Sequence, residues 1–327
     1  MQAWQVARLG DPAEALALAE VGVPRPRPGL LRIRVAAAGI GLPDLLMCRG
    51  SYALAPQLPF TPGQELVGVV SAVEGESELR VGERVAAVSA FFVGHGAFAE
   101  EALAVASFAL PAPEALPDAE AAGFTIPFHT AYVGLVRRGQ LRAGETLLVL
   151  GGAGGTGSAA LQLGRALGAR VIATAGSPEK AAFCRELGAL HVVDHHREDL
   201  AAAVREATQG RGADVVYDPV GGDAFRAATR CIAHEGRILV VGFASGSWAE
   251  PQSADLVNKN YSVVGVVPTH YDRDFRLRAQ NELLALHRSG ELRVPVHRVA
   301  PFDALPDALG ELAAGGVLGK SVLSVAR

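Results

Sequence analysis

Three glycines near the middle of the chain have the spacing of a dinucleotide-binding turn. Gly152, Gly154 and Gly157 follow a short apolar run at 146–150 and precede a stretch of helical periodicity at 158–168. In that setting the first glycine permits a tight turn, the second lets a pyrophosphate approach the backbone, and the third lets helix and strand pack closely. An ordinary tight turn is the alternative. The predicted phosphate-binding residues are Gly152, Gly154, Gly155, Thr156 and Gly157.

The end of the next apolar run, 169–175, indicates which dinucleotide such a site would take. A site that selects NAD holds an Asp or Glu roughly 20 residues beyond the glycines, where the carboxylate binds the ribose. Ala175 stands there instead, and Ser177 and Lys180 follow it closely. A hydroxyl and an ammonium suit the 2′-phosphate of NADP. The same two residues also fit a plain helix start, with Ser177 as N-cap and Lys180 in solvent.

Composition and charge exclude several classes of function. Of 327 residues, 50% are hydrophobic and 20% charged, as in ordinary globular proteins. The net charge of -4 argues against nucleic acid as the main partner. No uninterrupted apolar stretch approaches the roughly 18 residues of a membrane span, and the N-terminus lacks a signal-peptide pattern, so we expect a cytoplasmic protein. The cysteines and histidines lack ligand spacing, so no metal is expected.

The periodicity of the chain changes at Pro117. Before it, short strand-like runs alternate with Pro- and Gly-rich turns, which favours a partly open β-barrel. After it, nearly continuous apolar strands alternate with helices, as in a doubly wound parallel sheet, and the tail then leaves that pattern. We therefore expect an α/β protein with a barrel-type domain at 1–121, a nucleotide-binding domain at 122–263 and a second part of the barrel-type domain at 264–327.

Six segments in chain order carry a family resemblance. They are AAAGIGLPDLLMCRGSYALAPQLPFTPGQELVGVV (36–70), IPFHTAYVGL (126–135), the glycine turn, VVYDPVGG (215–222), GRILVVGFASG (236–246) and LGKSVL (318–323). Together they resemble the zinc-independent quinone oxidoreductase (zeta-crystallin-like) branch of the medium-chain dehydrogenase/reductase superfamily. The resemblance implies a Rossmann-type domain, a GroES-like catalytic domain, NADPH as cofactor, no zinc, and a homodimer.

Two positions separate this chain from the zinc alcohol dehydrogenases that it also resembles. Gly41 and Gln64 stand where those enzymes carry a cysteine and a histidine ligand of catalytic zinc. Lewis-acid chemistry on an alcohol is therefore disfavoured. Gly41 also replaces an asparagine that is usual in the quinone reductase pattern near the nicotinamide ribose or the substrate, whereas Asp44 matches that pattern.

The resemblance also assigns roles to residues outside the glycine turn. It places Thr130 against the nicotinamide ring, although packing inside a helix is an equal alternative for this residue. Tyr52, in an R-x-G-x-Y-like segment, is expected to line the acceptor pocket or to donate a hydrogen bond to the acceptor; a packed loop aromatic is the alternative. Asp44 is the third expected catalytic residue. The further cofactor contacts that it implies are Gly41, His195 near the 2′-phosphate, Gly242, Phe243 and Ala244 under the cofactor, and Lys320 near the phosphates.

Because no metal site and no nucleophile with its base is recognisable, a bound cofactor would have to supply the difficult chemistry. Hydride addition to a quinone or enone gives a delocalised anion that needs only a hydrogen bond and a proton. We therefore expect an NADPH-dependent quinone oxidoreductase; an enone or alkenal reductase and a non-catalytic, redox-responsive NADPH-binding protein are the alternatives. The apolar run 261–267 would leave an exposed strand edge, so we expect it to pair with a second copy.

Overall fold

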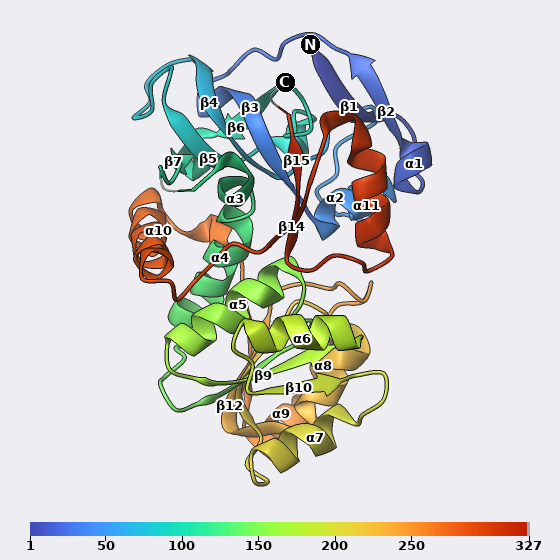
Figure 1. Ribbon diagram of the computed structural model, residues 1–327, viewed down its shortest axis with the longest axis vertical. Helices are drawn as coiled ribbons and strands as arrows, with labels where there is room; N and C mark the ends of the chain where they lie inside the picture. Colours follow the sequence, from blue (N-terminus) through green and yellow to red (C-terminus); the bar gives the residue numbers. More distant parts are fainter. Residues whose placement is uncertain (115, 326–327) are drawn as a thin grey trace. The chain divides into compact units, whose positions relative to one another are not determined.

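The computed structural model describes residues 1–114 and 116–325, and these form two compact units (Figure 1). The first unit contains Met1–Ile126, Asp272–Leu277 and Val294–Arg327, of which residues 115, 326 and 327 lie outside the described part. The second contains Pro127–Tyr271 and Arg278–Arg293. None of the described helices is both long and apolar enough to cross a membrane.

A six-stranded parallel sheet forms the centre of the second unit. Its strand order is β10-β9-β8-β11-β12-β13. The chain enters the sheet at the central strand β8, adds β9 and β10 on one side, and then crosses back to add β11, β12 and β13 on the other side. This is the doubly wound arrangement predicted from the alternation of strands and helices. The inner strands bury mainly apolar side chains, such as Leu147 and Leu148 of β8 and Val215 and Val216 of β11, since helices cover the sheet. The strands are β8 (Thr146–Val149), β9 (Arg170–Ala175), β10 (His191–Asp194), β11 (Ala213–Asp218), β12 (Ile232–Val240) and β13 (Ser262–Gly265).

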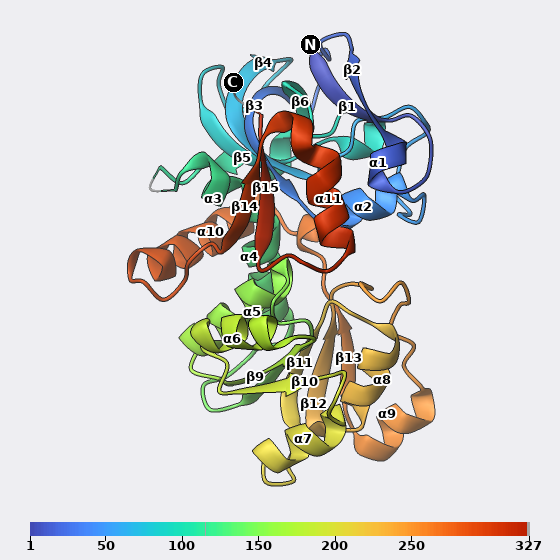
Figure 2. The same ribbon diagram turned by 45° about the vertical axis from the view of Figure 1, so that its right-hand side comes forward.

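The helices of the second unit lie against this sheet (Figure 2). The helix after the glycine turn, α5, carries small and apolar residues that pack on β8 and β9. Helix α4 runs on into a π-helical segment, Val133–Arg138, which Gly139 closes by donating its N–H to the carbonyl of Gly134. The helices are α4 (Thr125–Tyr132), α5 (Gly155–Ala166), α6 (Pro178–Glu186), α7 (Leu200–Ala207), α8 (Gly222–Thr229) and α9 (Ser253–Lys259).

The first unit is built on a strongly bent, mostly antiparallel sheet. Its order is β14-β15-β3-β4-β5-β7, and β6 also pairs with the long strand β3. The tail of the chain belongs to this sheet, because β15 pairs antiparallel with β3. The strands are β3 (Leu30–Ile40), β4 (Glu65–Val73), β5 (Arg84–Val88), β6 (Glu101–Val105), β7 (Leu110–Pro111), β14 (Val296–Ala300) and β15 (Lys320–Ser324), with a separate hairpin of β1 (Gln2–Val6) and β2 (Leu16–Glu20).

Short helices close the first unit around an apolar core. Phe60, Leu66 and Phe98 are fully buried there, together with residues of α2 and α11. The short helix α2 begins directly after β3 and therefore projects its first turn from the end of that strand. The helices are α1 (Pro12–Ala15), α2 (Leu42–Cys48), α3 (Asp118–Ala122) and α11 (Leu305–Ala313).

The units divide the chain differently from the boundaries expected at 121 and 263. Residues 122–126 belong to the first unit, and 264–271 continue the second. The long helix α10 (Arg273–Arg288) is shared, because its first turn belongs to the first unit and the rest to the second. A hydrogen bond ties the later part to the second unit, because the Tyr132 hydroxyl donates to Glu282; Arg165 also donates to the carbonyl of Glu291, just beyond the end of the helix.

Candidate functional site

The glycine turn of the second unit forms a cradle at the start of α5. A Cβ on Gly157 would lie 2.2 Å from the carbonyl oxygen of Gly151, and one on Gly152 would lie 2.8 Å from Cβ of Ala173. Both glycines therefore allow the turn to pack closely against its own unit. Gly154 differs, because a Cβ there would meet only the oxygen of Gly151, at 3.5 Å. Its open side suits the approach of a pyrophosphate to the first N–H groups of α5.

The residues predicted to meet a 2′-phosphate lie around the ends of β9 and β10. Ser177 caps α6, since its Oγ accepts the backbone N–H of Lys180 at 3.2 Å. The backbone of His195 donates to the carbonyl of Ala175, and its ring lies 4.2 Å from the ring of His196, centroid to centroid. Burial, and then the neighbouring His196, lower the pKa of His195.

A glycine lets both imidazoles come close to the turn. A Cβ on Gly176 would lie 2.9 Å from Cε1 of His195 and 3.0 Å from Nε2 of His196. The structure thus brings Ala175, Ser177 and His195 together and adds His196, which was not among the predicted cofactor contacts. The sequence could have indicated His196 because it directly follows His195 at a strand end, where neighbouring residues share their surroundings.

Asp218 holds two turns at the end of β11, one through its carboxylate and the other, which is expected under the cofactor, through its backbone carbonyl. Oδ1 of Asp218, at the end of β11, accepts the N–H groups of Val220 and Gly221, both at 2.8 Å. Its backbone carbonyl accepts the N–H groups of Val241 and Gly242. Burial raises the pKa of Asp218. Sequence reasoning missed this residue, although a lone acid at the end of a predicted parallel strand was the available signal.

An aromatic pair follows the same turn. The ring of Phe243 stacks on that of Trp248, with centroids 4.3 Å apart, and Trp248 is 55% exposed. The N–H of Ala244 donates to the carbonyl of Pro219, so the segment Gly242–Ala244 is tied to the end of β11. Thr130, in α4, is 6% exposed, and its role against a nicotinamide stays a prediction.

A second cluster of polar groups lies in the first unit, at the start of α2. Asp44 is only 1% exposed, yet its Oδ2 accepts the N–H of Gly41 at 2.8 Å and its Oδ1 accepts the N–H of Gly63 at 3.1 Å. Burial raises the pKa of Asp44 to about 7, although the nearby ammonium of Lys320 opposes the rise. Asp44 therefore joins two loops and gains or loses its proton near neutral pH.

A buried ion pair lies beside Asp44. Oε1 of Glu65, which is 1% exposed, lies 2.6 Å from Nζ of Lys320. Oε2 of the same carboxylate accepts the N–H of Ile126 at 2.7 Å. Sequence reasoning did not single out Glu65 and directed Lys320 towards the cofactor phosphates. The structure gives Lys320 a carboxylate partner within its own unit.

These two parts of the molecule match known proteins. Residues 27–114 match the alcohol dehydrogenase GroES-like domain, and residues 155–281 match the zinc-binding dehydrogenase domain. Quinone oxidoreductase-like protein 2 of Bos taurus is 35% identical over 92% of this chain and 87% of its own length. Human quinone oxidoreductase is 29% identical over 99% of this chain and 97% of its own length. The chain belongs to the quinone oxidoreductase family of medium-chain dehydrogenases/reductases.

Solved structures of this family have the same fold. The quinone oxidoreductase of Escherichia coli, complexed with NADPH, is 29% identical and has a TM-score of 0.91 over 99% of this chain and 100% of its own. A Pseudomonas syringae quinone oxidoreductase is 30% identical and has a TM-score of 0.89 over 99% of each chain. The predicted combination of a Rossmann-type and a GroES-like domain is thereby confirmed.

The two positions at which the resemblance to zinc alcohol dehydrogenases would place zinc ligands are occupied by Gly41 and Gln64. Gly41 and Gln64 flank the Asp44 cluster, on either side of the loop contacts that Asp44 makes. Neither side chain can ligate zinc. Within residues 1–114 and 116–325, no group of three or more His, Cys, Asp or Glu side chains is arranged to hold a metal ion.

Tyr52 lies beside the same cluster and at the edge of an aromatic group. Its ring lies 6.2 Å from that of Phe91, which in turn meets the exposed ring of Phe92 at 5.6 Å. Burial raises the pKa of the Tyr52 hydroxyl; Gln64 lowers it, although its Nε2 makes no well-formed hydrogen bond. The hydroxyl therefore stays protonated and can donate, and its role towards an acceptor stays a prediction.

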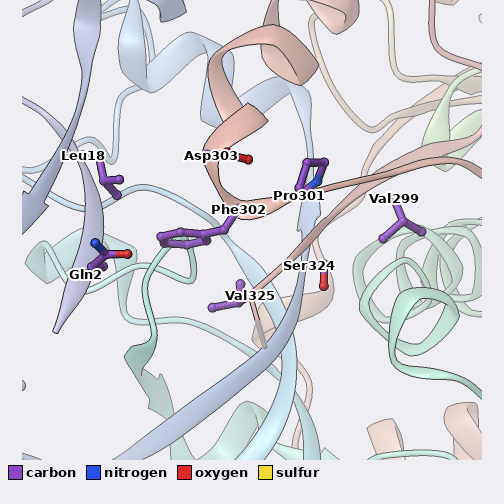
Figure 3. A pocket seen from close by; sticks show the side chains of 8 residues that line it. All are labelled: Gln2, Leu18, Val299, Pro301, Phe302, Asp303, Ser324 and Val325. Carbon is purple, nitrogen blue, oxygen red and sulfur yellow. The ribbon is translucent and has the colours of Figure 1, made fainter. Parts of the chain in front are cut away.

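A separate cavity in the first unit contains none of these residues. It has a volume of about 530 Å³, and Figure 3 shows the Phe302 ring between the side chains of the β1-β2 hairpin and those that end β15. Apolar side chains dominate it, and Asp303 is its one ionisable side chain among those described. It is lined by Gln2, Leu18, Val299, Pro301, Phe302, Asp303, Ser324 and Val325.

Proposed function

We propose that the protein reduces quinones or related conjugated carbonyls with NADPH and without a metal. One observation carries the proposal: the open side of Gly154 at the start of α5 is combined with a strand end at Ala175 that has no acid at the ribose position and is followed by Ser177 and Lys180. The first feature suits a pyrophosphate, and the second suits a 2′-phosphate. The NADPH-complexed Escherichia coli relative supports the same cofactor.

The residues present fit this cofactor. The turn from Gly152 to Gly157 would hold the phosphates, and Ser177, Lys180 and His195 would surround the 2′-phosphate. The segment Gly242–Ala244, fixed by Asp218, would support the nicotinamide half, since that half binds on the β11 side of the sheet. NADPH supplies a hydride when bound, and the chain supplies binding, orientation and a proton.

The acceptor class follows from the groups of the first unit. A conjugated carbonyl that gains a hydride becomes a delocalised oxyanion, which a hydrogen-bond donor can stabilise without a Lewis acid. The Tyr52 hydroxyl and the Lys320 ammonium are such donors, and the rings of Phe91 and Phe92 provide apolar surface for a planar molecule. Quinones combine these properties. An enone or alkenal has the same carbonyl chemistry and is the second candidate.

We also propose that the protein is a homodimer. Strand β13 ends the six-stranded sheet, and none of the described residues pairs with its outer edge as a strand, although Arg138 donates to the carbonyl of Gly265. Val263 and Val264 are only partly buried in the single chain. Pairing β13 with its copy would extend the sheet and cover these residues.

A charge at the edge tests the dimer. Val264→Lys should shift the mass measured by light scattering from the dimer to the monomer, because two ammonium groups would meet near the two-fold axis. Val257→Lys, on the exposed face of α9, is the matched control and should leave the mass unchanged. A wild-type monomer would rule out the dimer and leave the proposed activity standing.

The activity itself is tested by the oxidation of NADPH at 340 nm with a panel of quinones and a panel of enones. Turnover with quinones supports the leading proposal, and turnover with enones alone supports the second candidate. Tight NADPH binding without turnover on any acceptor would identify a non-catalytic NADPH-binding protein.

A further inference from the structure

We propose that the ammonium of Lys320 donates the proton that completes reduction of the acceptor, and that Asp44 resupplies this proton. The inference rests on the proposed function and deepens it by naming the proton source. It moves Lys320 from the cofactor phosphates, where the sequence motif placed it, to the acceptor. Three features of the first unit carry it: the ion pair of Lys320, the missing side chain at position 41, and the surroundings of Asp44.

The ion pair fixes the donor. Glu65 is buried and held from two sides, because Oε1 contacts Nζ of Lys320 at 2.6 Å and Oε2 accepts the N–H of Ile126 at 2.7 Å. A carboxylate in this position attracts and orients the neighbouring ammonium. An ammonium has three N–H donors, and Oε1 of Glu65 is in close ionic contact with it from one side. The side chain of Lys320 keeps 11% of its surface exposed.

Gly41 leaves space in front of this donor. A Cβ at position 41 would lie 3.3 Å from Nζ of Lys320 and 3.6 Å from Oδ2 of Asp44. Both polar atoms therefore border the volume that a side chain at position 41 would fill. The backbone of Gly41 is extended, with φ −136° and ψ 167°, so a larger residue would fit the backbone. Glycine is thus explained by the space it leaves and not by the conformation of the chain.

Asp44 is placed to act as the proton reservoir. It is buried beside Lys320, and its two backbone hydrogen bonds, from Gly41 and Gly63, hold it there. The titratable groups that face it are Lys320 on β15, Glu65 on β4, and Cys48 and Tyr52, whose own pKa values Asp44 raises. A carboxyl with a pKa of about 7 holds a proton through much of the neutral range and can release it.

The proposed step balances in atoms and electrons. When the hydride adds to the acceptor, the π electrons of the conjugated carbonyl move onto its oxygen. An N–H bond of Lys320 then breaks and an O–H bond forms, while the N–H electron pair stays on the nitrogen. The resulting amine takes the carboxyl proton of Asp44, and the carboxylate regains a proton from water. The acceptor has gained one hydride and one proton, and no protein group has changed its oxidation state.

Single-turnover kinetics of the NADPH-loaded protein test the step. The rate of quinone reduction is measured by stopped flow between pH 6 and 9, in H₂O and in D₂O. For the wild type we expect a normal solvent isotope effect and a rate that falls as pH rises above about 7, where Asp44 has lost its proton. Lys320→Met should lower the rate by roughly 10²-fold to 10⁴-fold and abolish both dependences.

Three companion variants keep the test decisive. Lys320→Met with Glu65→Gln removes both charges, so it avoids an unpaired buried carboxylate and should reproduce the kinetic loss even if the single variant fails to fold. Gly41→Ala should slow the same step without removing a titratable group, because its methyl group fills the space beside Nζ. Lys259→Met, at a surface ion pair on α9, is the matched control and should behave as the wild type.

A readout without turnover follows Asp44 directly. Carbon-13 NMR of the carboxyl groups in the free protein should show the pKa of Asp44 rise in Lys320→Met, since the ammonium lowers it in the wild type. The proposal is overturned if Lys320→Met retains the isotope effect and the pH dependence, or if the Asp44 titration does not move. A wild type that reduces no acceptor would overturn the proposed function itself, and so the two failures are distinct.

Discussion

Oε1 of Glu65 and Nζ of Lys320 lie 2.6 Å apart in the interior of the first unit, on strands β4 and β15. Removal of one partner from a buried pair leaves an uncompensated charge. We therefore expect Glu65→Gln to lower the free energy of unfolding by about 3–5 kcal/mol. Urea unfolding can be followed by the fluorescence of Trp4, which is buried in the same unit, in a background with Trp248→Phe.

The double variant serves as the control for this prediction. Glu65→Gln with Lys320→Met removes both charges and should recover much of the lost stability. If the single and the double variant lose the same free energy of unfolding, the uncompensated charge of Lys320 is not the cause of the loss.

Asp44 makes the stability of the first unit depend on pH. Its pKa is about 7 in the folded chain and 3.8 in the reference state, so the folded chain holds more protons between these values. The free energy of unfolding should therefore fall as pH rises from about 4 to 7 and level off above, by on the order of 4 kcal/mol in total. Asp44→Asn should remove this dependence in urea unfolding at pH 5 and pH 8.

Asp223→Asn provides the comparison, because Asp223 is exposed on α8 and pairs only with Arg226 among the described residues. It should keep the pH dependence of the wild type. A wild type whose stability is flat between pH 5 and 7, or rises, would mean that Asp44 titrates at an ordinary carboxyl pKa.

Two glycines of the phosphate turn should respond in opposite ways. Gly157→Ala places a Cβ 2.2 Å from the oxygen of Gly151, so the turn must shift and Tm should fall. Gly154→Ala meets ordinary contact distances in the free chain, so Tm should hold while the NADPH dissociation constant rises. Differential scanning calorimetry and fluorescence titration separate the two effects. If Gly154→Ala binds NADPH as tightly as the wild type, the phosphates do not bind at this turn.

Lys180 should decide between the two nicotinamide dinucleotides. A charge-assisted hydrogen bond to phosphate contributes about 1.5–3 kcal/mol, so Lys180→Ala should raise the KM for NADPH by roughly 10-fold to 100-fold. The KM for NADH should stay within about twofold, because NADH lacks the 2′-phosphate. Arg185→Ala, exposed on the same helix α6, is the matched control. Equal changes for both cofactors would refute the assignment.

The nucleotide-binding half could be predicted from the sequence because its signals are local. In a parallel sheet each strand, turn and helix follow one another, so the apolar run at β8, the glycine spacing and the missing acid at Ala175 all lie within 30 positions or so. The same locality placed Ser177 at the start of α6, where it caps the helix.

The cluster of Asp44, Glu65 and Lys320 could not be predicted, because pairing of distant strands in the sheet brings these residues together. Glu65 on β4 and Lys320 on β15 both border β3, and the register of these three strands is not written in any local pattern. Position 41 shows the consequence. The sequence showed only that Gly41 replaces the asparagine usual in the family pattern, whereas the structure shows that this glycine leaves space beside Nζ of Lys320.

Helix α10 shows a similar limit. The amphipathic pattern of residues 272–289 predicts a helix, and α10 spans Arg273–Arg288, but the pattern gives no information about the partners of the helix. The hydrogen bond of Tyr132 to Glu282 ties its later part to the nucleotide-binding unit, and Arg165 donates to the carbonyl of Glu291 just beyond the end of the helix. Domain boundaries drawn where the pattern changes therefore missed a helix that two units share.

Reduction of a conjugated carbonyl by NADPH is the central activity proposed for this protein. The decisive measurement is the initial rate of NADPH oxidation by the purified protein with a simple benzoquinone or naphthoquinone, compared with NADH and with a chelator present throughout. We predict turnover with NADPH that the chelator does not change, and a much lower kcat/KM with NADH. Activity that disappears with the chelator, or NADPH binding without oxidation by any quinone or enone, would contradict the account.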